Sequence, residues 1–332
     1  MTRKNPQNGG GLSSNSKSSV ITKQNEKGCS VTLLPKISAA QLFCIMLLSR
    51  LTMDVIAPPP VPESPAEALC VIAVTELVRL AIASPLIYYS FRRDNIHRSI
   101  YRKNRFLGWL SGIFACVLLV GAAAKTLMHG TDFAYKNRLV GGGNVWIVFA
   151  AAAAFAVYAV YMGVEATARA GVLFLIVAAI MTAAVFLADI PYMKISPMWT
   201  KSGFGTFFND VFRCFSNGGE YLVFAALLPC VNREKSSSAG SCVLWFALIS
   251  AVASAGICAV NYLILREMYP LAEYPFIASA SLADIALFKR LDGLTAAVWE
   301  LCAAFRTGLL LLSAVCVITT VVRAAREKKE KV

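Results

Sequence analysis

The stretch CFSNGGEYLVFAALLPC, residues 214–230, places a glutamate between a polar segment with two glycines and an apolar run. The polar segment, residues 216–219, reads Ser-Asn-Gly-Gly, and these residue types weaken a helix and favour caps and turns. The run that follows Glu220 is apolar enough to lie in lipid. The sequence therefore predicts a helix that breaks inside a membrane, just before Glu220.

The composition of the whole chain is that of an integral membrane protein. Of its 332 residues, 57% are hydrophobic and 15% are charged, and the mean hydropathy is +0.61. Soluble domains carry about 25% charged residues. Long apolar runs recur along the chain, each near the roughly 20 residues that a helix needs to cross ~30 Å of hydrocarbon. We therefore expect an all-α polytopic membrane protein.

The apolar runs predict eight transmembrane spans within one helical domain, residues 37–322. The spans are residues 37–57, 66–89, 106–128, 145–163, 170–190, 207–230, 242–265 and 294–322. Residues 1–36 are polar and rich in Ser, Asn and Gly, and they predict a disordered cytoplasmic tail. Residues 323–332 predict a basic cytoplasmic C-terminal tail.

The net charge of +13 is concentrated in a few segments. Lys and Arg gather in residues 1–36, in residues 92–105 and after residue 322. With the N-terminal tail inside, these segments fall on one side of the membrane, as the positive-inside rule requires, so both termini are expected to be cytoplasmic. A nucleic-acid partner is not expected, because it would need a basic face on a folded soluble module.

The cysteines and histidines predict no metal or cofactor site. The ten cysteines form no CxxC pair and lie mostly within spans, where they act as small apolar residues. The two histidines, His97 and His129, fall in predicted loops on opposite sides of the membrane. No catalytic residues are assigned, because the spans lack a His/Asp/Ser or acidic-pair constellation, so an enzyme is not expected.

Charged residues inside the spans are informative, because each costs a few kcal/mol at the bilayer centre unless it is paired or faces a cavity. Arg50 and Asp54 are four residues apart and Glu76 and Arg79 are three apart, so each pair has the spacing to meet on one helix face. Lys125 is near the outer end of its span and is expected to snorkel to the interface.

Three further charges have no partner on their own helix. Glu300 and Arg306 are six residues apart, so each is expected to seek a partner on another helix or subunit. Glu220 has no Lys or Arg within one turn. Its partner is expected to be transient, either a ligand ammonium or a proton; the alternative is a glutamate held by neighbouring helices.

A broken helix within a membrane predicts a ligand site. Unwound backbone is tolerated there only if it is buried in protein or lines a cavity. The N-terminus of a half-helix attracts a carboxylate and a nearby acid receives an ammonium, so an amino acid fits. The first span has a weaker counterpart, where hydroxyl side chains would support an irregular turn. The candidate ligand-binding residues are Ser49, Thr52, Asn217, Gly218, Gly219 and Glu220. The alternative for the glycines is a close contact between helices.

Several stretches together resemble a known family. They are KISAAQLFCIMLL (36–48), YMGVEATARAGVLFLIV (161–177), FSNGGEYLVFAALLPCVNREK (215–235) and YPFIASASLADIALFKRLDGLTAAVWELCAAFRTGLLL (274–311). Their order and spacing are similar to those of the B subunits of bacterial spore germinant receptors. GVEATAR (163–169) and KRLD (289–292) are the most telling segments.

The resemblance implies a fold and a setting. The family belongs to the amino acid/polyamine/organocation transporter superfamily and has a LeuT-like (APC-type) bundle of ten spans, in which the first and sixth are broken. With about eight predicted spans, this chain would be truncated by the last two helices. The family senses nutrients in the inner membrane of the spore, beside an A subunit and a C-subunit lipoprotein, and triggers ion release.

The expected function is therefore a nutrient-sensing subunit of a spore germination receptor, which binds an amino acid near the bilayer midplane. The alternatives are an amino-acid permease of the same fold and a purely structural partner protein.

Two connections between spans also carry structural predictions. Glu165 and Arg169 are expected to form an exposed ion pair in a short connection between spans, and residues 275–288 an amphipathic stretch along the interface or against the bundle.

Overall fold

The computed structural model describes residues 37–58, 65–92, 100, 104–137, 139, 144–194, 206–231, 239–283 and 291–329. These residues belong to one compact unit that starts at Pro35. The predicted tail, residues 1–36, lies outside the described residues. In the described ranges the regular structure is helical, apart from an isolated bridge between Ile37 and Val231.

The helices follow the apolar runs of the sequence. They are α1 (Ala39–Ile56), α2 (Pro65–Arg92), α4 (Arg105–Lys136), α5 (Val145–Asp189), α6 (Phe207–Ser216), α7 (Glu220–Leu227), α8 (Ala239–Leu265), α9 (Pro275–Ala280) and α10 (Asp292–Lys329). Short 3-10 turns follow three of them, at Ile190–Tyr192, Leu228–Cys230 and Arg266–Leu271. Side-chain caps mark several helix starts: Ser38 forms a capping box with Gln41 before α1, and Asn144 accepts a hydrogen bond from the amide of Trp146 before α5.

Five segments of the described chain are long and apolar enough to cross a membrane. They are Ala39–Ile56, Arg105–Lys136, Val145–Tyr192, Cys242–Leu271 and Asp292–Arg326. Large apolar side chains are exposed along them, such as Phe114 on α4 and Val157 on α5. Lipid is the solvent that suits such a surface. These helices and their exposed apolar surface confirm the prediction of an all-α protein embedded in a membrane.

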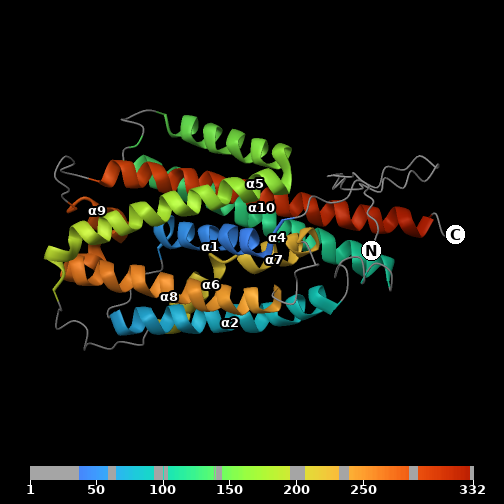
Figure 1. Ribbon diagram of the computed structural model, residues 1–332, viewed down its shortest axis with the longest axis horizontal. Coiled ribbons are helices and arrows are strands. Elements are labelled where there is room, and N and C mark those ends of the chain that lie inside the picture. Colours follow the sequence, from blue (N-terminus) through green and yellow to red (C-terminus); the bar gives the residue numbers. More distant parts are fainter. Residues whose placement is uncertain are drawn as a thin grey trace, which may run out of the picture. The chain divides into compact units, whose positions relative to one another are not determined.

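Helix α5 is kinked at Gly163. Gly163 has φ 83° and ψ 178°, a conformation open only to glycine, and the second half of α5 turns back from the first (Figure 1). The sequence predicted a connection between spans across residues 164–169, but these residues are helical and the connection is reduced to Gly163. The expected exposed ion pair between Glu165 and Arg169 is present, on the first turns of the second half.

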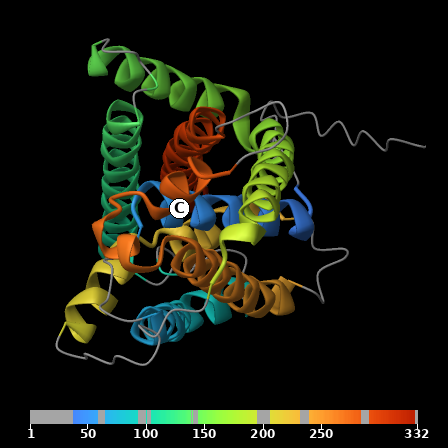
Figure 2. The ribbon, with the colours of Figure 1, turned by 90° about the vertical axis from the view of Figure 1, so that its left-hand side faces the viewer.

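Helices α1 and α10 form the interior of the bundle. Helix α1 contacts α5, α7, α8 and α10, and both ribbon views place it among the other helices (Figures 1 and 2). Of the most apolar stretch of α10, 72% is buried, against 17% for α5, so α10 is central and α5 peripheral. Small residues permit this packing, because a Cβ on Gly308 of α10 would come within 2.8 Å of the Cβ of Ala159 on α5.

The segment between α8 and α10 packs against the bundle. Ser279 of α9 donates to the side chain of Asn261 on α8 at 3.1 Å. Phe276 meets the rings of Phe186 and Trp299 edge-on, with centroids 5.7 and 6.0 Å apart. Of the two places expected for this stretch, the described part lies against the helices, while residues 284–290, with the start of KRLD, lie outside the described residues.

The C-terminal end of α10 differs from the sequence-based prediction. Residues 323–329 were assigned to a separate basic tail, but α10 continues to Lys329. Ala324 is 3% exposed and packs with Val321, and Ala325 packs against both, so one face of α10 is still buried at residue 324. The tail is therefore a continuation of the helix as far as Lys329.

Candidate functional site

The helix break predicted before Glu220 is confirmed. Helix α6 ends at Ser216 and α7 begins at Glu220, and the backbone between them is not helical. The side chain of Asn217 donates to the carbonyl of Ala57, just past α1, at 3.3 Å. The break is therefore tied to the end of α1.

Cationic side chains from three different helices cap the carbonyl end of α6. Arg79 of α2 donates to the carbonyl of Cys214. Lys125 of α4 donates to the carbonyl of Ser216 at 3.3 Å. Arg306 of α10 donates to the carbonyl of Asn217 at 3.1 Å. The last carbonyls of a helix lack intrahelical partners and carry the negative end of its dipole, so cations stabilise them. The break is thus held from three sides.

A buried ion pair between α7 and α10 lies at the break. Arg306 donates through Nη1 to Oε1 of Glu220 at 2.6 Å, and both side chains are 1% exposed. The second carboxylate oxygen accepts from the amide of Gly219 at 3.0 Å. In this structure the partner of Glu220 is a residue of α10, which fits the alternative of a glutamate held by neighbouring helices. Sequence reasoning missed the pair because 86 positions separate the two residues.

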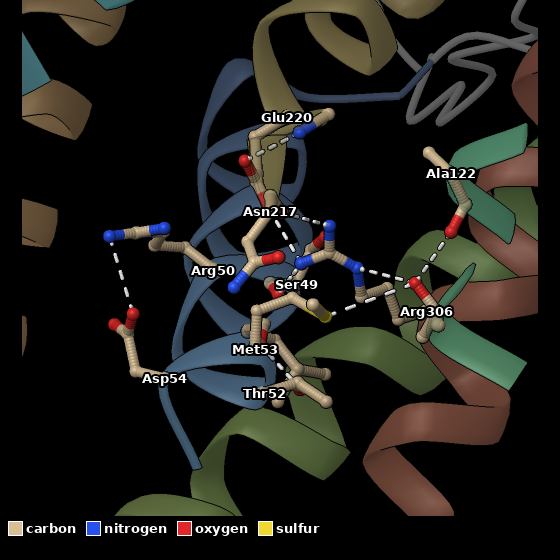
Figure 3. Close-up of polar contacts among 12 residues, drawn as sticks. Ser49, Arg50, Thr52, Met53, Asp54, Ala122, Asn217, Glu220 and Arg306 are labelled. Carbon is tan, nitrogen blue, oxygen red and sulfur yellow. Dashed lines mark hydrogen bonds and ion pairs between the residues drawn. The ribbon is translucent and has the colours of Figure 1, made fainter. Parts of the chain in front are cut away.

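Arg306 also donates hydrogen bonds to α1 and α4. Its Nη1 donates to the carbonyl of Ser49, and its Nε donates to Oγ1 of Thr126 at 3.2 Å (Figure 3). Thr126 in turn donates to the carbonyl of Ala122 at 2.8 Å. Every nitrogen of the guanidinium is satisfied, which is what a buried arginine requires. The expected partner of Arg306 on another helix is confirmed.

A second charged cluster lies between α1 and α2. Arg50 is 3.2 Å from the carboxylate of Asp54 and 3.3 Å from that of Glu76, and Arg79 is 2.5 Å from Glu76. Ser254 of α8 donates to Asp54 at 2.5 Å. Both pairs expected from spacing are confirmed, and the contact between Arg50 and Glu76 joins them into one network.

The first span departs from its predicted role. Helix α1 is continuous from Ala39 to Ile56, so the irregular turn expected around Ser49 and Thr52 is wrong. Thr52 donates to the carbonyl of Leu48 one turn earlier, at 2.7 Å, which satisfies its hydroxyl inside the helix. Ser49 contributes its backbone carbonyl rather than an unwound amide.

Two further charged side chains, Lys125 and Glu300, lie near α4 and the break. The Nζ of Lys125 donates to the carbonyl of Ser216 and, at 3.0 Å, to its hydroxyl, so the ammonium has partners within the protein. Glu300 faces α4, where its carboxylate oxygens are 3.4 Å from the position a Cβ on Gly130 would take. One of these oxygens, Oε2, has no hydrogen-bond partner among the described residues.

A cavity of 460 Å³ adjoins the break, between α2, α4, α6 and α7. Its polar wall residues are Arg79, Lys125, Ser216 and Tyr221, and the two glycines of the break complete that wall. The rest of the lining is apolar: Ile82, Ala83, Val117, Leu118, Gly121, Ala122, Phe215 and Leu222. The cavity lies beside the break rather than between α1 and α7.

The six candidate residues divide into separate groups. Ser49, Asn217 and Glu220 meet around Arg306, whereas Gly218 and Gly219 line the cavity and Thr52 donates to a carbonyl of its own helix, α1. A Cβ on Gly218 would lie 2.7 Å from Nε of Arg79, so this position is closely packed. That contact fits the alternative interpretation of the glycines as a close contact between elements.

In the described part of the chain, no group of three or more His, Cys, Asp or Glu side chains could hold a metal ion. His129 lies within α4 rather than in the predicted loop, and His97 lies outside the described residues. No family model matches the chain, and its comparison with curated proteins and with solved structures gives no match.

Proposed function

We propose that the protein is a nutrient-sensing subunit of a spore germination receptor that binds an amino acid at the helix break. The observation that carries the proposal is the ion pair of Glu220 and Arg306, buried where α6 ends and α7 begins. The similarity of the sequence to germinant receptor B subunits supplies the biological setting. We assign the chain no catalytic reaction.

The ion pair has the chemistry to recognise a zwitterion. An amino acid carries an ammonium that complements Glu220 and a carboxylate that complements Arg306. Breaking the pair without replacement would leave two buried charges unpaired, which costs several kcal/mol. A zwitterion that enters between the two side chains offers each a new partner and leaves the net charge of the site unchanged.

Such an exchange would also move the helices. Arg306 holds the carbonyls of Ser49 and Asn217, so it joins α10 to α1 and to the end of α6. When its guanidinium turns toward a ligand carboxylate, these bonds weaken. Binding would thereby change how α1, α6 and α10 are held together, which is what a sensor must transmit.

We further propose a LeuT-like arrangement in which the chain crosses the membrane about eight times. The contact of α1 with α7 and the meeting of Ser49 and Asn217 on Arg306 support it, because the fold places its first and sixth spans together. The two halves of α5 and the α6–α7 pair supply the crossings beyond the long continuous helices. In the same proposal, both termini are cytoplasmic, the membrane is the inner membrane of the spore, and the partners are an A subunit and a C-subunit lipoprotein.

An amino-acid permease of the same fold is the second candidate, favoured by the same helix break. Proteoliposomes separate the two: a sensor binds a radiolabelled amino acid without sustained accumulation, and a permease accumulates it. The proposal itself is tested by germination of a deletion strain on a panel of single nutrients. Loss of the response to one amino acid, restored by the intact gene, supports it; an unchanged response to every nutrient overturns it.

A further inference from the structure

The cavity beside the break combines two cationic side chains with a lining that is otherwise mostly apolar. Lys125 and Arg79 contribute the charge, and none of the described residues that line the cavity is acidic. Arg79 has Glu76 as a counter-charge, whereas Lys125 contacts only the carbonyl and hydroxyl of Ser216 within the described chain. Among the described residues, the cavity wall therefore carries a cation without a counter-charge.

Hydrogen-bond donors on the same wall are unsatisfied. Nε of Arg79 and the hydroxyl of Tyr221 have no partner in the part of the chain that the structure describes. Arg79 is 3% exposed and Tyr221 9% exposed, so an acceptor reaches these donors when the two side chains turn toward the cavity. Buried donors without partners are unfavourable, so they favour a ligand that supplies acceptors. Lys125 adds a third donor, because an ammonium has three hydrogens and only two contacts here.

The cavity also suits hydrocarbon. Ile82, Val117 and Leu118 line it, and these side chains are 57%, 63% and 40% exposed. In a protein embedded in a membrane, side chains of this kind contact lipid tails. An apolar chain that starts at the cationic wall therefore passes from the cavity directly into the bilayer.

From the donors, the unneutralised cation and the apolar lining, we propose that this cavity binds an amphiphilic anion. Its acidic group lies against Lys125, Arg79 and Tyr221, and its hydrocarbon chain lies along α2 and α4. The proposal does not depend on nutrient sensing, since the zwitterion site is centred on Arg306. The occupant is either a free carboxylate amphiphile or an anionic phospholipid, which share this chemistry.

The ligand would act on the helix break. Lys125 caps Ser216 and Arg79 caps Cys214, so both cations that face the cavity also hold the carbonyl end of α6. An acidic group that draws them away loosens this end of the helix. Occupancy of the cavity would therefore modulate any function that uses the break.

Photolabelling tests the proposal. The full-length protein is reconstituted in phosphatidylcholine nanodiscs and labelled with decanoate that carries a diazirine on its chain, beside a matched diazirine decanol. We expect the acid to label α2 and α4 near Ile82, Val117 and Leu118, in competition with unlabelled decanoate, and the alcohol to label them weakly. Phosphatidylglycerol is then added to the nanodiscs. Its competition with the probe assigns the site to an anionic lipid, and its failure to compete assigns it to a free carboxylate.

Matched variants decide the role of the charge. Lys125→Met should weaken labelling by about tenfold, the loss expected for a charge-assisted hydrogen bond, whereas Lys136→Met, on the same helix and outside the cavity, should not. Ile82→Trp should block labelling by filling the cavity, and Leu77→Trp, an exposed position of α2 outside it, is its control. The Ile82 pair keeps the test valid if Lys125→Met does not fold. Equal labelling by acid and alcohol, or labelling of both cavity variants at wild-type strength, would overturn the proposal.

Discussion

Glu220, at the start of α7, and Arg306 of α10 pair at 2.6 Å beside the break between α6 and α7, with each side chain 1% exposed. Removal of one partner from such a pair leaves a buried charge and costs about 3–5 kcal/mol. Glu220→Gln and Arg306→Gln should therefore each lower the stability of the purified protein strongly. The double variant should lose clearly less stability than the sum of the two single losses, because it leaves no unpaired charge. Thermal unfolding in detergent measures the cycle.

Glu165→Gln is the matched control for this cycle. It breaks an ion pair with Arg169 that is exposed, with side chains 49% and 71% accessible. Exposed pairs contribute little, so this variant should unfold near the wild-type temperature. Strictly additive losses in the Glu220 and Arg306 variants would contradict the interpretation that the two side chains act as one unit.

The nutrient response gives a second prediction for the same glutamate. Glu220→Gln keeps the size and much of the hydrogen bonding but removes the charge that would receive an ammonium. If Glu220 binds the germinant, the dose response should shift by about tenfold or more, because a charge-assisted hydrogen bond contributes about 1.5–3 kcal/mol. Germination assays at matched protein abundance measure the shift. An unchanged dose response would favour a glutamate that serves only to hold α7 to α10.

The two glycines of the break should respond differently to alanine. A Cβ on Gly218 would lie 2.7 Å from Nε of Arg79, which is fixed by Glu76 and by the carbonyl of Cys214. On Gly219 the nearest atom would be 3.4 Å away, an ordinary contact. Gly218→Ala should therefore lower thermal stability and response, and Gly219→Ala should retain both. Equal tolerance would mean that Arg79 is able to move aside.

Replacement of both glycines by leucine is the stronger form of this test. Leucine favours a continuous helix and fills space, so the double variant should abolish the response more than it lowers the amount of protein in the membrane. Immunoblots and germination assays on the same spores compare the two effects. Normal accumulation together with a normal response would show that the break is not needed for sensing.

Interactions within one helix could be predicted from the sequence, whereas those between helices could not. The pair of Arg50 and Asp54 follows from a spacing of four residues, and the break follows from residues 216–219. The partner of Glu220 and the capping of Ser216 by Lys125 depend on how α4, α6 and α10 pack, which one sequence does not specify. Residues 164–169 were predicted to connect two spans, whereas in the structure they continue α5 as helix.

Topology yields a prediction that tests the number of crossings. An even number of spans with a cytoplasmic N-terminus places the end of α10 in the cytoplasm, where its basic residues are favoured. A reporter that is active only in the cytoplasm, fused after Val332, should therefore be active in a bacterial host. A reporter that needs export should be inactive at the same position. The opposite pattern would require an odd number of crossings and would contradict the proposed arrangement.

The turn in α5 gives the last prediction, in which two glycines are expected to respond with opposite signs. Gly163 has φ 83°, and a Cβ added there would meet nothing within 4 Å, so the cost of Gly163→Ala is one of backbone conformation alone. Such strain costs about 1–3 kcal/mol. Gly256, within α8, also has open space around its Cβ position but lacks a positive φ, so Gly256→Ala should stabilise the helix by about 0.5–1 kcal/mol. Thermal unfolding of the two variants in the same detergent compares them. A loss at Gly163 with a gain at Gly256 supports a sharp turn that returns the chain across the membrane, and equal gains at both positions would show that α5 runs through residue 163 as one continuous helix.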